Sequence, residues 1–188
     1  MKEPADSEYR RNQFVDAADK LFREHGIVET TISSIVREVD VAKGLFYYYF
    51  KSKDDVIEAV CEKYSRDFLQ AIQSSLNPDN DYDERLYGFI DNTIGSFRMM
   101  WDNLCGANRN IDLTILSSRS VDEAKQIASE KLAELLKEGN ERNRTHIGNP
   151  EYFARILVSG IADLASQAET DLSEIQKMIR DMIRKEGM

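Results

Sequence analysis

Apolar side chains recur at spacings of three and four along almost the whole chain, which is the period of an amphipathic helix. No segment shows the alternation of apolar and polar residues that predicts a half-buried strand. The pattern predicts helices at about residues 7–25, 31–39, 42–49, 53–76, 83–103, 108–118, 120–143, 150–168 and 171–185. The predicted fold class is therefore all-α, with about nine helices.

Several predicted helix ends carry residues that cap free backbone amides. Thr31 and Asn149 are good N-cap residues, and a proline after Asn149 suits the first position of a helix. Ser120 is followed three residues later by Glu123, a capping-box pattern that predicts a helix start. Asp40 lies where the chain must turn, and Asp tolerates the left-handed conformation.

The two short helices at 31–39 and 42–49, preceded by the helix at 7–25, predict a helix-turn-helix. Its core is expected to contain Ile35, Val39, Val41, Phe46 and Phe50. The opposite face of the second short helix is then free to enter the major groove of DNA. This part of the chain, residues 1–53, is the predicted DNA-binding domain.

The exposed face of that second helix carries residues suited to DNA. Lys43 supplies positive charge to phosphate or guanine, and Gly44 allows the backbones to approach closely. Leu45 suits a thymine methyl, and the hydroxyls of Tyr47 and Tyr48 suit phosphate oxygens. We also expect Thr31 to hold a phosphate at a helix N-terminus and Lys53 to clamp the backbone from the other side.

The segment TTISSIVREVDVAKGLFYYYFKSKDDVI, with FVDAADKLFREHG before it, resembles the TetR family of tetracycline-repressor-like transcription regulators. The resemblance covers about residues 10–58 and implies that Ser33 and Arg37 also reach bases or phosphates. Two positions depart from the family pattern. Asp40 stands at the turn position that is usually glycine, and Leu45 stands where threonine is frequent, which favours an apolar contact.

Charge divides the chain into two parts. Residues 1–53 contain nine Lys/Arg and nine Asp/Glu, so residues 54–188 carry the whole net charge of −9. A neutral head can bind DNA if its basic residues gather on one face, and an acidic body stays away from phosphate. Two cysteines outside any CxxC motif, no apolar leader and no long apolar run predict a cytoplasmic protein without a membrane partner, nucleoid-associated when bound to DNA.

For residues 54–188 the resemblance implies a regulatory domain that dimerises through its last two helices and binds an inducer. The broad apolar faces of those helices support a homodimer independently, although both helices packing within one chain is the alternative. The predicted dimerisation residues are Phe153, Ile156, Leu157, Gly160, Ile161, Leu164, Ile175, Met178, Ile179 and Met182.

Large apolar residues around the helix at 83–103 are candidates either for a ligand pocket or for ordinary core. They are Tyr64, Phe68, Phe89, Phe97, Met100, Trp101 and Cys105. An apolar or aromatic ligand fits such a set, and the acidic body also leaves a cationic compound open. Two histidines and two cysteines offer no metal-ligand spacing, and no cofactor is expected.

These features predict a homodimeric repressor that binds a palindromic operator and is released by a small molecule. A DNA-binding regulator without an inducer is one alternative, and a helical enzyme using a cavity of the body is another. The chain has no glycine-rich phosphate loop, no HExxH and no GxSxG, so we expect no catalytic residues.

Overall fold

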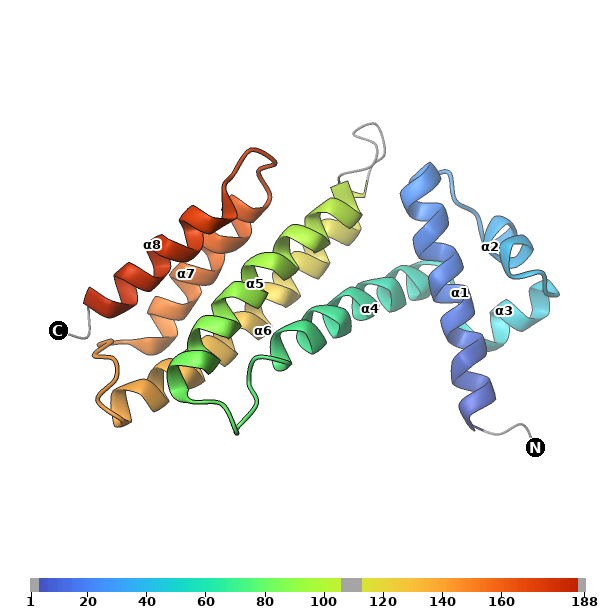
Figure 1. Cartoon of the computed structure of the whole chain (residues 1–188). Coiled ribbons are helices and arrows are strands. Elements are labelled where there is room, and N and C mark those ends of the chain that lie inside the picture. Colours follow the sequence, from blue (N-terminus) through green and yellow to red (C-terminus); the bar gives the residue numbers. More distant parts are fainter. Residues whose placement is uncertain (1–3, 106–112, 186–188) are drawn as a thin grey trace. The chain divides into compact units, whose positions relative to one another are not determined.

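The computed structural model describes residues 4–105 and 113–185, with side chains for 7–104 and 113–183. Eight helices and no strands make up this part of the chain, which confirms the all-α prediction (Figure 1). The helices are α1 (Pro4–His25), α2 (Ile32–Val39), α3 (Lys43–Tyr49), α4 (Lys53–Gln73), α5 (Tyr82–Cys105), α6 (Thr114–Glu141), α7 (Pro150–Ala165) and α8 (Leu172–Lys185).

The prediction of separate helices at 108–118 and 120–143 was wrong where the structure describes it, because α6 runs without a break from Thr114. Ser120 is fully buried within this helix instead of capping it. Glu123 accepts a hydrogen bond from the hydroxyl of Ser65, 2.6 Å away, so its carboxylate serves a contact between helices. Residues 108–112 lie outside the described residues.

The chain divides into two compact units, 1–64 with 102–120 and 65–101 with 121–188. The division falls inside three helices, α4, α5 and α6. The functional boundary that we expect between residues 53 and 54 remains a prediction.

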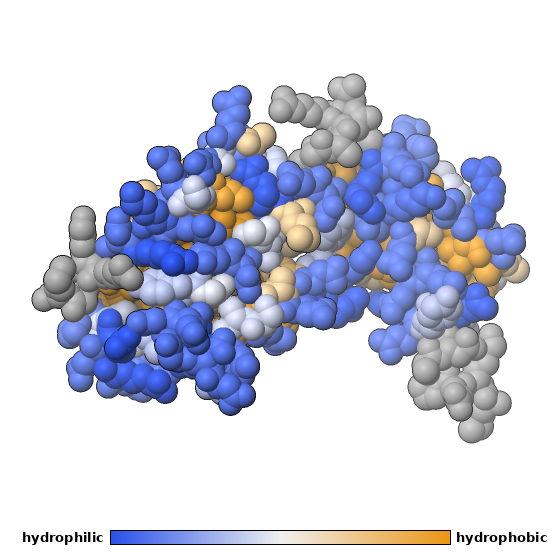
Figure 2. Space-filling model, in the orientation of Figure 1, coloured by the Kyte–Doolittle hydropathy of each residue, from blue (hydrophilic) through white to orange (hydrophobic). Residues whose placement is uncertain are grey.

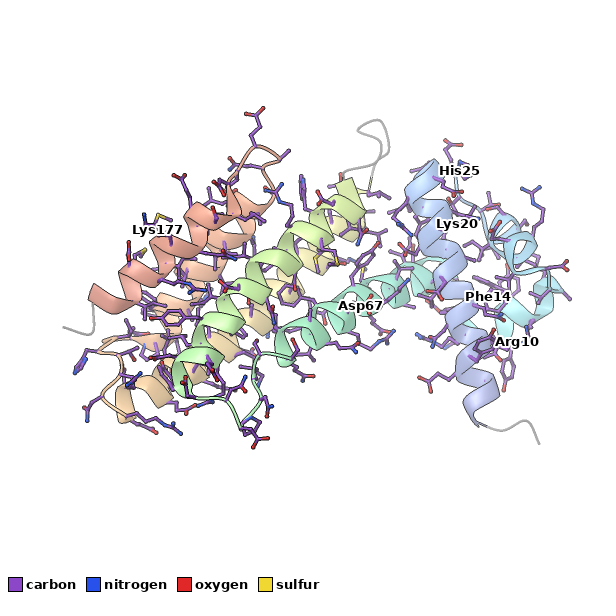
Figure 3. All side chains as sticks on the ribbon, in the orientation of Figure 1. Arg10, Phe14, Lys20, His25, Asp67 and Lys177 are labelled. Carbon is purple, nitrogen blue, oxygen red and sulfur yellow. The ribbon has the colours of Figure 1, made fainter. Side chains whose placement is uncertain are left out.

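In the first unit an aromatic cluster joins α1 to α3. The Phe14 ring packs edge-on against Phe46 at 5.6 Å and against Phe50 at 6.3 Å between ring centroids. Figure 3 shows Phe14 on the side of α1 nearest α3. All three rings are almost completely buried, so this apolar contact fixes one face of α3 and leaves the other to solvent.

The ends of α2 follow from local side-chain chemistry. The hydroxyl of Thr31 accepts the backbone amide of Ser34, and the Ser34 hydroxyl caps the amide of Thr31 in return. Asp40 ends the helix in the left-handed conformation, at φ 55° and ψ 54°. Both features were predicted, and together they set the turn that leads into α3.

In the second unit, charged pairs join neighbouring helices. Arg85 of α5 pairs with Glu138 of α6, and Arg180 of α8 donates to Asp91 of α5 at 2.5 Å. Gly139 leaves room for the hydroxyl of Tyr82, because a Cβ at this position would clash with that oxygen. The visible face of the molecule is mainly hydrophilic, with smaller hydrophobic areas (Figure 2).

Among the described residues, no helix combines the length and apolar character that crossing a membrane requires.

Candidate nucleic-acid interface

The outer face of α3 is polar and aromatic, whereas its inner face is apolar. Lys43 and Gly44 are exposed, and the side chains of Tyr47 and Tyr48 are 50% and 75% exposed. Leu45 is half-buried. The predicted orientation of this helix is therefore confirmed, while the contacts of these residues with DNA stay predictions.

Gly44 is not required by the packing of the chain. A Cβ built at this position meets no atom within 4 Å, and the residue lies in the first turn of α3. Alanine has the higher helix propensity, by about 1 kcal/mol. Packing within the chain therefore does not explain the glycine at position 44. Close approach of a DNA backbone to α3 would explain it.

On α2, the residues implied by the family resemblance have different surroundings. Ser33 and Arg37 are exposed, and the Arg37 guanidinium has no hydrogen bond or ion pair with any described residue. Thr31 is also exposed, but its hydroxyl is already used in the cap of α2. Arg37 is consequently the freest of the three to meet a phosphate or a base.

Lys53 does not lie free at the end of the interface. Its ammonium donates to the backbone oxygen of Ile27, and to that of Val28 at 3.4 Å. This contact ties the start of α4 to the loop before α2. The structure thus gives Lys53 a role inside the fold that spacing along the sequence does not reveal.

Lys20 of the first unit is paired with a carboxylate, whereas Lys51 is not. Lys20, labelled in Figure 3, lies 2.6 Å from Glu38. This hydrogen bond and the opposite charge raise the pKa of Lys20 and lower the pKa of Glu38. Lys51, by contrast, is exposed and its ammonium has no hydrogen bond or ion pair with a described residue. Sequence reasoning passed over Lys51, although it lies two residues after the end of α3.

The buried carboxylate of Asp19 joins α1 to α4 in the first unit. Asp19 of α1 is 4% exposed and accepts hydrogen bonds from Tyr64 at 2.8 Å and Lys63 at 3.2 Å, both on α4. Arg23 adds an ion pair at 3.3 Å. Burial lowers the pKa of Lys63, but the hydrogen bond to Asp16 and the charge of Asp19 outweigh it, so the pKa is raised.

The predicted dimerisation residues separate into two groups in the second unit. Leu157, Ile161, Ile175 and Ile179 are at most 8% exposed, so they pack within the chain and cannot form the outer surface of a dimer contact. Phe153 and Leu164 are half-buried. The members of the set left on the surface are Ile156, Gly160, Met178 and Met182, and Tyr152 lies beside them at 65% exposure.

The predicted ligand residues do not line one open cavity. Phe68, Phe89, Phe97 and Met100 are buried in the second unit, with the Phe68 and Phe97 rings 4.9 Å apart. Trp101 is partly exposed. Tyr64 belongs to the first unit and donates to Asp19, and the side chain of Cys105 lies outside the described residues.

A groove of about 530 Å³ does lie along α6 and α7, and eight of its nine lining residues are polar or charged. None of the predicted ligand residues contributes to it; the lining includes Lys125, Ser129, Arg155 and Ser159. The described residues contain no group of three His, Cys, Asp or Glu side chains placed to hold a metal ion.

Comparison with known proteins identifies the first part of the chain. Residues 14–60 match the family model "Bacterial regulatory proteins, tetR family". The HTH-type transcriptional regulator HbdR of Aromatoleum sp. is 38% identical over 82 residues, which are 42% of this chain and 36% of HbdR. The chain thus spans little more than a third of that relative.

Two further similarities cover most of the chain. The HTH-type transcriptional repressor KstR2 of Mycolicibacterium smegmatis is 25% identical over 182 residues, 95% of this chain and 78% of KstR2. The structure of SmeT with triclosan superposes with a TM-score of 0.67 at 22% identity, covering 92% of this chain and 88% of SmeT. SmeT is the repressor of the Stenotrophomonas maltophilia efflux pump SmeDEF.

The helix-turn-helix with its exposed α3 and the match of the family model lead to one conclusion: residues 14–60 are a DNA-binding segment of the tetR family of bacterial regulatory proteins, in a chain with the all-helical fold of SmeT.

Proposed function

We propose that this protein is a transcription regulator that reads double-stranded DNA with α3. The observation that carries the proposal is the division of α3 into a buried aromatic side and an outer side with Lys43, Gly44 and Tyr48. A helix held in this way can enter the major groove, where lysine and tyrosine contact phosphates and bases. HbdR and KstR2 are both regulators by name, which favours this function over a helical enzyme.

The regulator acts as a homodimer on an inverted repeat. The support is the exposed apolar surface on α7 and α8, where Ile156 is 76%, Met178 51% and Met182 44% exposed. Three such side chains on neighbouring helices favour contact with a second copy over contact with water. Two copies related by a two-fold axis present two α3 helices to two half-sites of opposite orientation.

A small apolar or aromatic molecule binds inside the second unit and releases the DNA. The support is the cluster of Phe68, Phe89, Phe97 and Met100, together with the hydroxyl of Thr93, which is buried without a hydrogen-bond partner among the described residues. A ligand with one polar group satisfies this hydroxyl and displaces part of the apolar packing. SmeT in complex with triclosan provides the precedent in a protein of the same fold.

Repression is the mode that we assign, because KstR2 and SmeT are both named as repressors. A repressor of this kind works in the cytoplasm and lies on the nucleoid while it is bound to its operator.

A binding-site selection tests the proposal. The full chain is incubated with a random duplex library at low salt, and the retained DNA is sequenced. We expect an inverted repeat, and we expect none from the Lys43→Ala/Tyr48→Phe variant. Lys137→Ala, which alters an exposed lysine of α6, is the matched control and should retain the repeat. A folded wild-type dimer that enriches no sequence contradicts the proposed function.

The ligand is tested separately by thermal unfolding in the presence of apolar aromatic compounds, with triclosan as the first probe. A compound that binds the folded chain raises its unfolding temperature. An effector must also lower the affinity for the selected DNA, because the two binding equilibria are linked. Stabilisation without release, or no stabilisation by the whole panel, supports a regulator without a small-molecule inducer.

A further inference from the structure

The groove along α6 and α7 lies within the second unit, and none of the apolar residues proposed above to hold an effector lines it. Its volume of about 530 Å³ falls in the range of small-molecule sites, about 300–1,000 Å³. Five of its lining residues carry a charge: Asp122, Lys125, Glu130, Glu151 and Arg155. These charges decide which class of molecule the groove can hold.

Two of the three carboxylates in the lining are already engaged within the chain. Lys137 lies 2.6 Å from Glu151, and the hydrogen bond and charge of this lysine lower the pKa of the Glu151 carboxyl. Glu130 accepts a hydrogen bond from the side-chain amide of Gln126 at 3.1 Å. Neither carboxylate therefore needs a ligand as its partner.

The other three charged groups of the lining have no such partner. The side chains of Lys125, Arg155 and Asp122 make neither a hydrogen bond nor an ion pair with any residue that the structure describes. Lys125 is nevertheless half-buried, so its ammonium loses water without gaining a counter-ion. Two cations and one carboxylate are thus left to meet a ligand.

The two cations lie on opposite sides of the middle of the groove. Residues 142–149 join α6 to α7, and the ion pair between these helices ties their adjoining ends, so they run antiparallel. Eight residues along each helix from that ion pair, Ser129 and Ser159 lie at about the same level. Arg155 is about 6 Å to one side of this level and Lys125 is about 6 Å to the other, four residues from the nearer serine in each case. The long side chains of both can therefore reach one molecule that lies over the two serines.

A complementary ligand carries two carboxylates for the two cations and one protonated amine for Asp122. A guanidinium binds a carboxylate through two parallel hydrogen bonds, and an ammonium binds it as a compact point charge. We propose that this groove binds an acidic amino acid, with its carboxylates on Arg155 and Lys125 and its ammonium on Asp122. The site is additional to the function proposed above and depends neither on DNA binding nor on the apolar effector.

Isothermal titration calorimetry of the full chain at low salt tests the proposal, with L-glutamate as the probe. Two analogues test the charges of the ligand: glutarate lacks the amine, and γ-aminobutyrate lacks one carboxylate. We expect each analogue to bind at least about tenfold more weakly than L-glutamate, because it loses a charge-assisted hydrogen bond and leaves one charge of the groove unpaired.

Substitutions in the lining test the location. Arg155→Gln and Lys125→Gln should each weaken L-glutamate binding by about tenfold or more, with an unchanged unfolding temperature in the absence of ligand. Asp122→Asn should weaken the binding of L-glutamate but not that of glutarate. Lys131→Gln is the matched control, because Lys131 is a lysine of α6 that pairs with Glu134 at 2.9 Å and does not line the groove. It should bind L-glutamate as the wild type does.

Three results would overturn the proposal. The absence of any heat of binding from L-glutamate rules out the ligand class. Binding that the Arg155 and Lys125 variants leave unchanged places the ligand elsewhere on the chain. Equal affinities for L-glutamate and glutarate remove the role of Asp122, and with it the amino acid as the occupant of the groove.

Discussion

The outer face of α3 and the surface formed by α7 and α8 are both exposed, but they differ in chemistry. Lys43 and Tyr48 give the first face a positive charge and hydroxyl groups on a rigid aromatic base. Ile156, Met178 and Met182 give the second surface apolar side chains on helices whose other sides fill the core. The exposed side chains of neither face are needed for packing within their own unit.

The difference indicates the kind of partner that each face meets. A polar face with unpaired cations gains from a polyanion, because the bound counterions of DNA are released. An apolar surface gains from another apolar surface, because both leave water. We therefore expect substitutions on the two faces to affect different equilibria, DNA binding in one case and self-association in the other.

The largest effect is expected from Ile156→Arg on α7. A dimer of this variant buries two unpaired charges, so we expect weaker association by about 4 kcal/mol, roughly a thousandfold. Sedimentation equilibrium measures the change. Met99→Arg is the control, since Met99 is 66% exposed but belongs to another helix, α5. Equal loss of dimer in both variants would remove the α7–α8 surface from the interface.

The next largest effect is expected on the stability of the first unit and comes from the buried carboxylate of Asp19. Asp19→Ala leaves the hydroxyl of Tyr64 without its carboxylate and removes two charged contacts, so we expect a loss of about 3 kcal/mol in the free energy of unfolding. Urea denaturation measures the loss. Asp16→Ala removes an exposed partner of Lys63 and should cost less than about 1 kcal/mol. An equal loss in the free energy of unfolding for both variants would show that buried Asp19 stabilises the fold no more than exposed Asp16 does.

A change on the α3 face itself should leave stability intact. Lys43→Ala combined with Tyr48→Phe removes one charge and one hydroxyl from exposed positions. We expect DNA affinity to fall by about a hundredfold, or about 3 kcal/mol, with an unchanged unfolding temperature. Fluorescence anisotropy on the selected duplex measures the affinity. Unchanged binding would remove α3 from the DNA interface.

The smallest effect is expected from Gly44→Ala, which should change stability and DNA binding in opposite directions. Gly44→Ala should stabilise the free chain by about 0.5–1 kcal/mol, because alanine favours the helix and its methyl group meets open space. The same methyl should weaken DNA binding if the duplex approaches α3 closely. Gly95→Ala on α5 also meets open space and should give the stability gain alone. Undiminished DNA binding by Gly44→Ala would mean that the duplex stays away from this position.

Much of the helix-turn-helix was predictable because its signals are local. Thr31 and Asn149 cap the helices that they were expected to cap, and Asp40 takes the left-handed conformation at the turn. Ser120 and Glu123 form the same kind of capping pattern, but the helix start that it predicts does not exist, because α6 continues through both residues. Burial of Ser120 and the bond between Glu123 and Ser65 are contacts between helices, and these override a local capping preference.

Which apolar side of a helix faces inward was not predictable from spacing. Leu157 and Ile156 are neighbours in a helix that is apolar over a wide arc, yet one is 8% and the other 76% exposed. The bond between Lys53 and the oxygen of Ile27 is similarly invisible, because it joins residues 26 positions apart. Both depend on how helices pack, which a single helix's pattern does not encode.

The first unit is discontinuous in sequence, since it draws on residues 102–120 as well as 1–64. The ion pair between Glu58 and Arg119 spans 61 residues and lies within it. During synthesis, the N-terminal segment therefore leaves the ribosome well before its own unit can be completed. Residues 1–64 are made before residues 102–120, so we expect the first unit to finish folding only after the later segment has been synthesised.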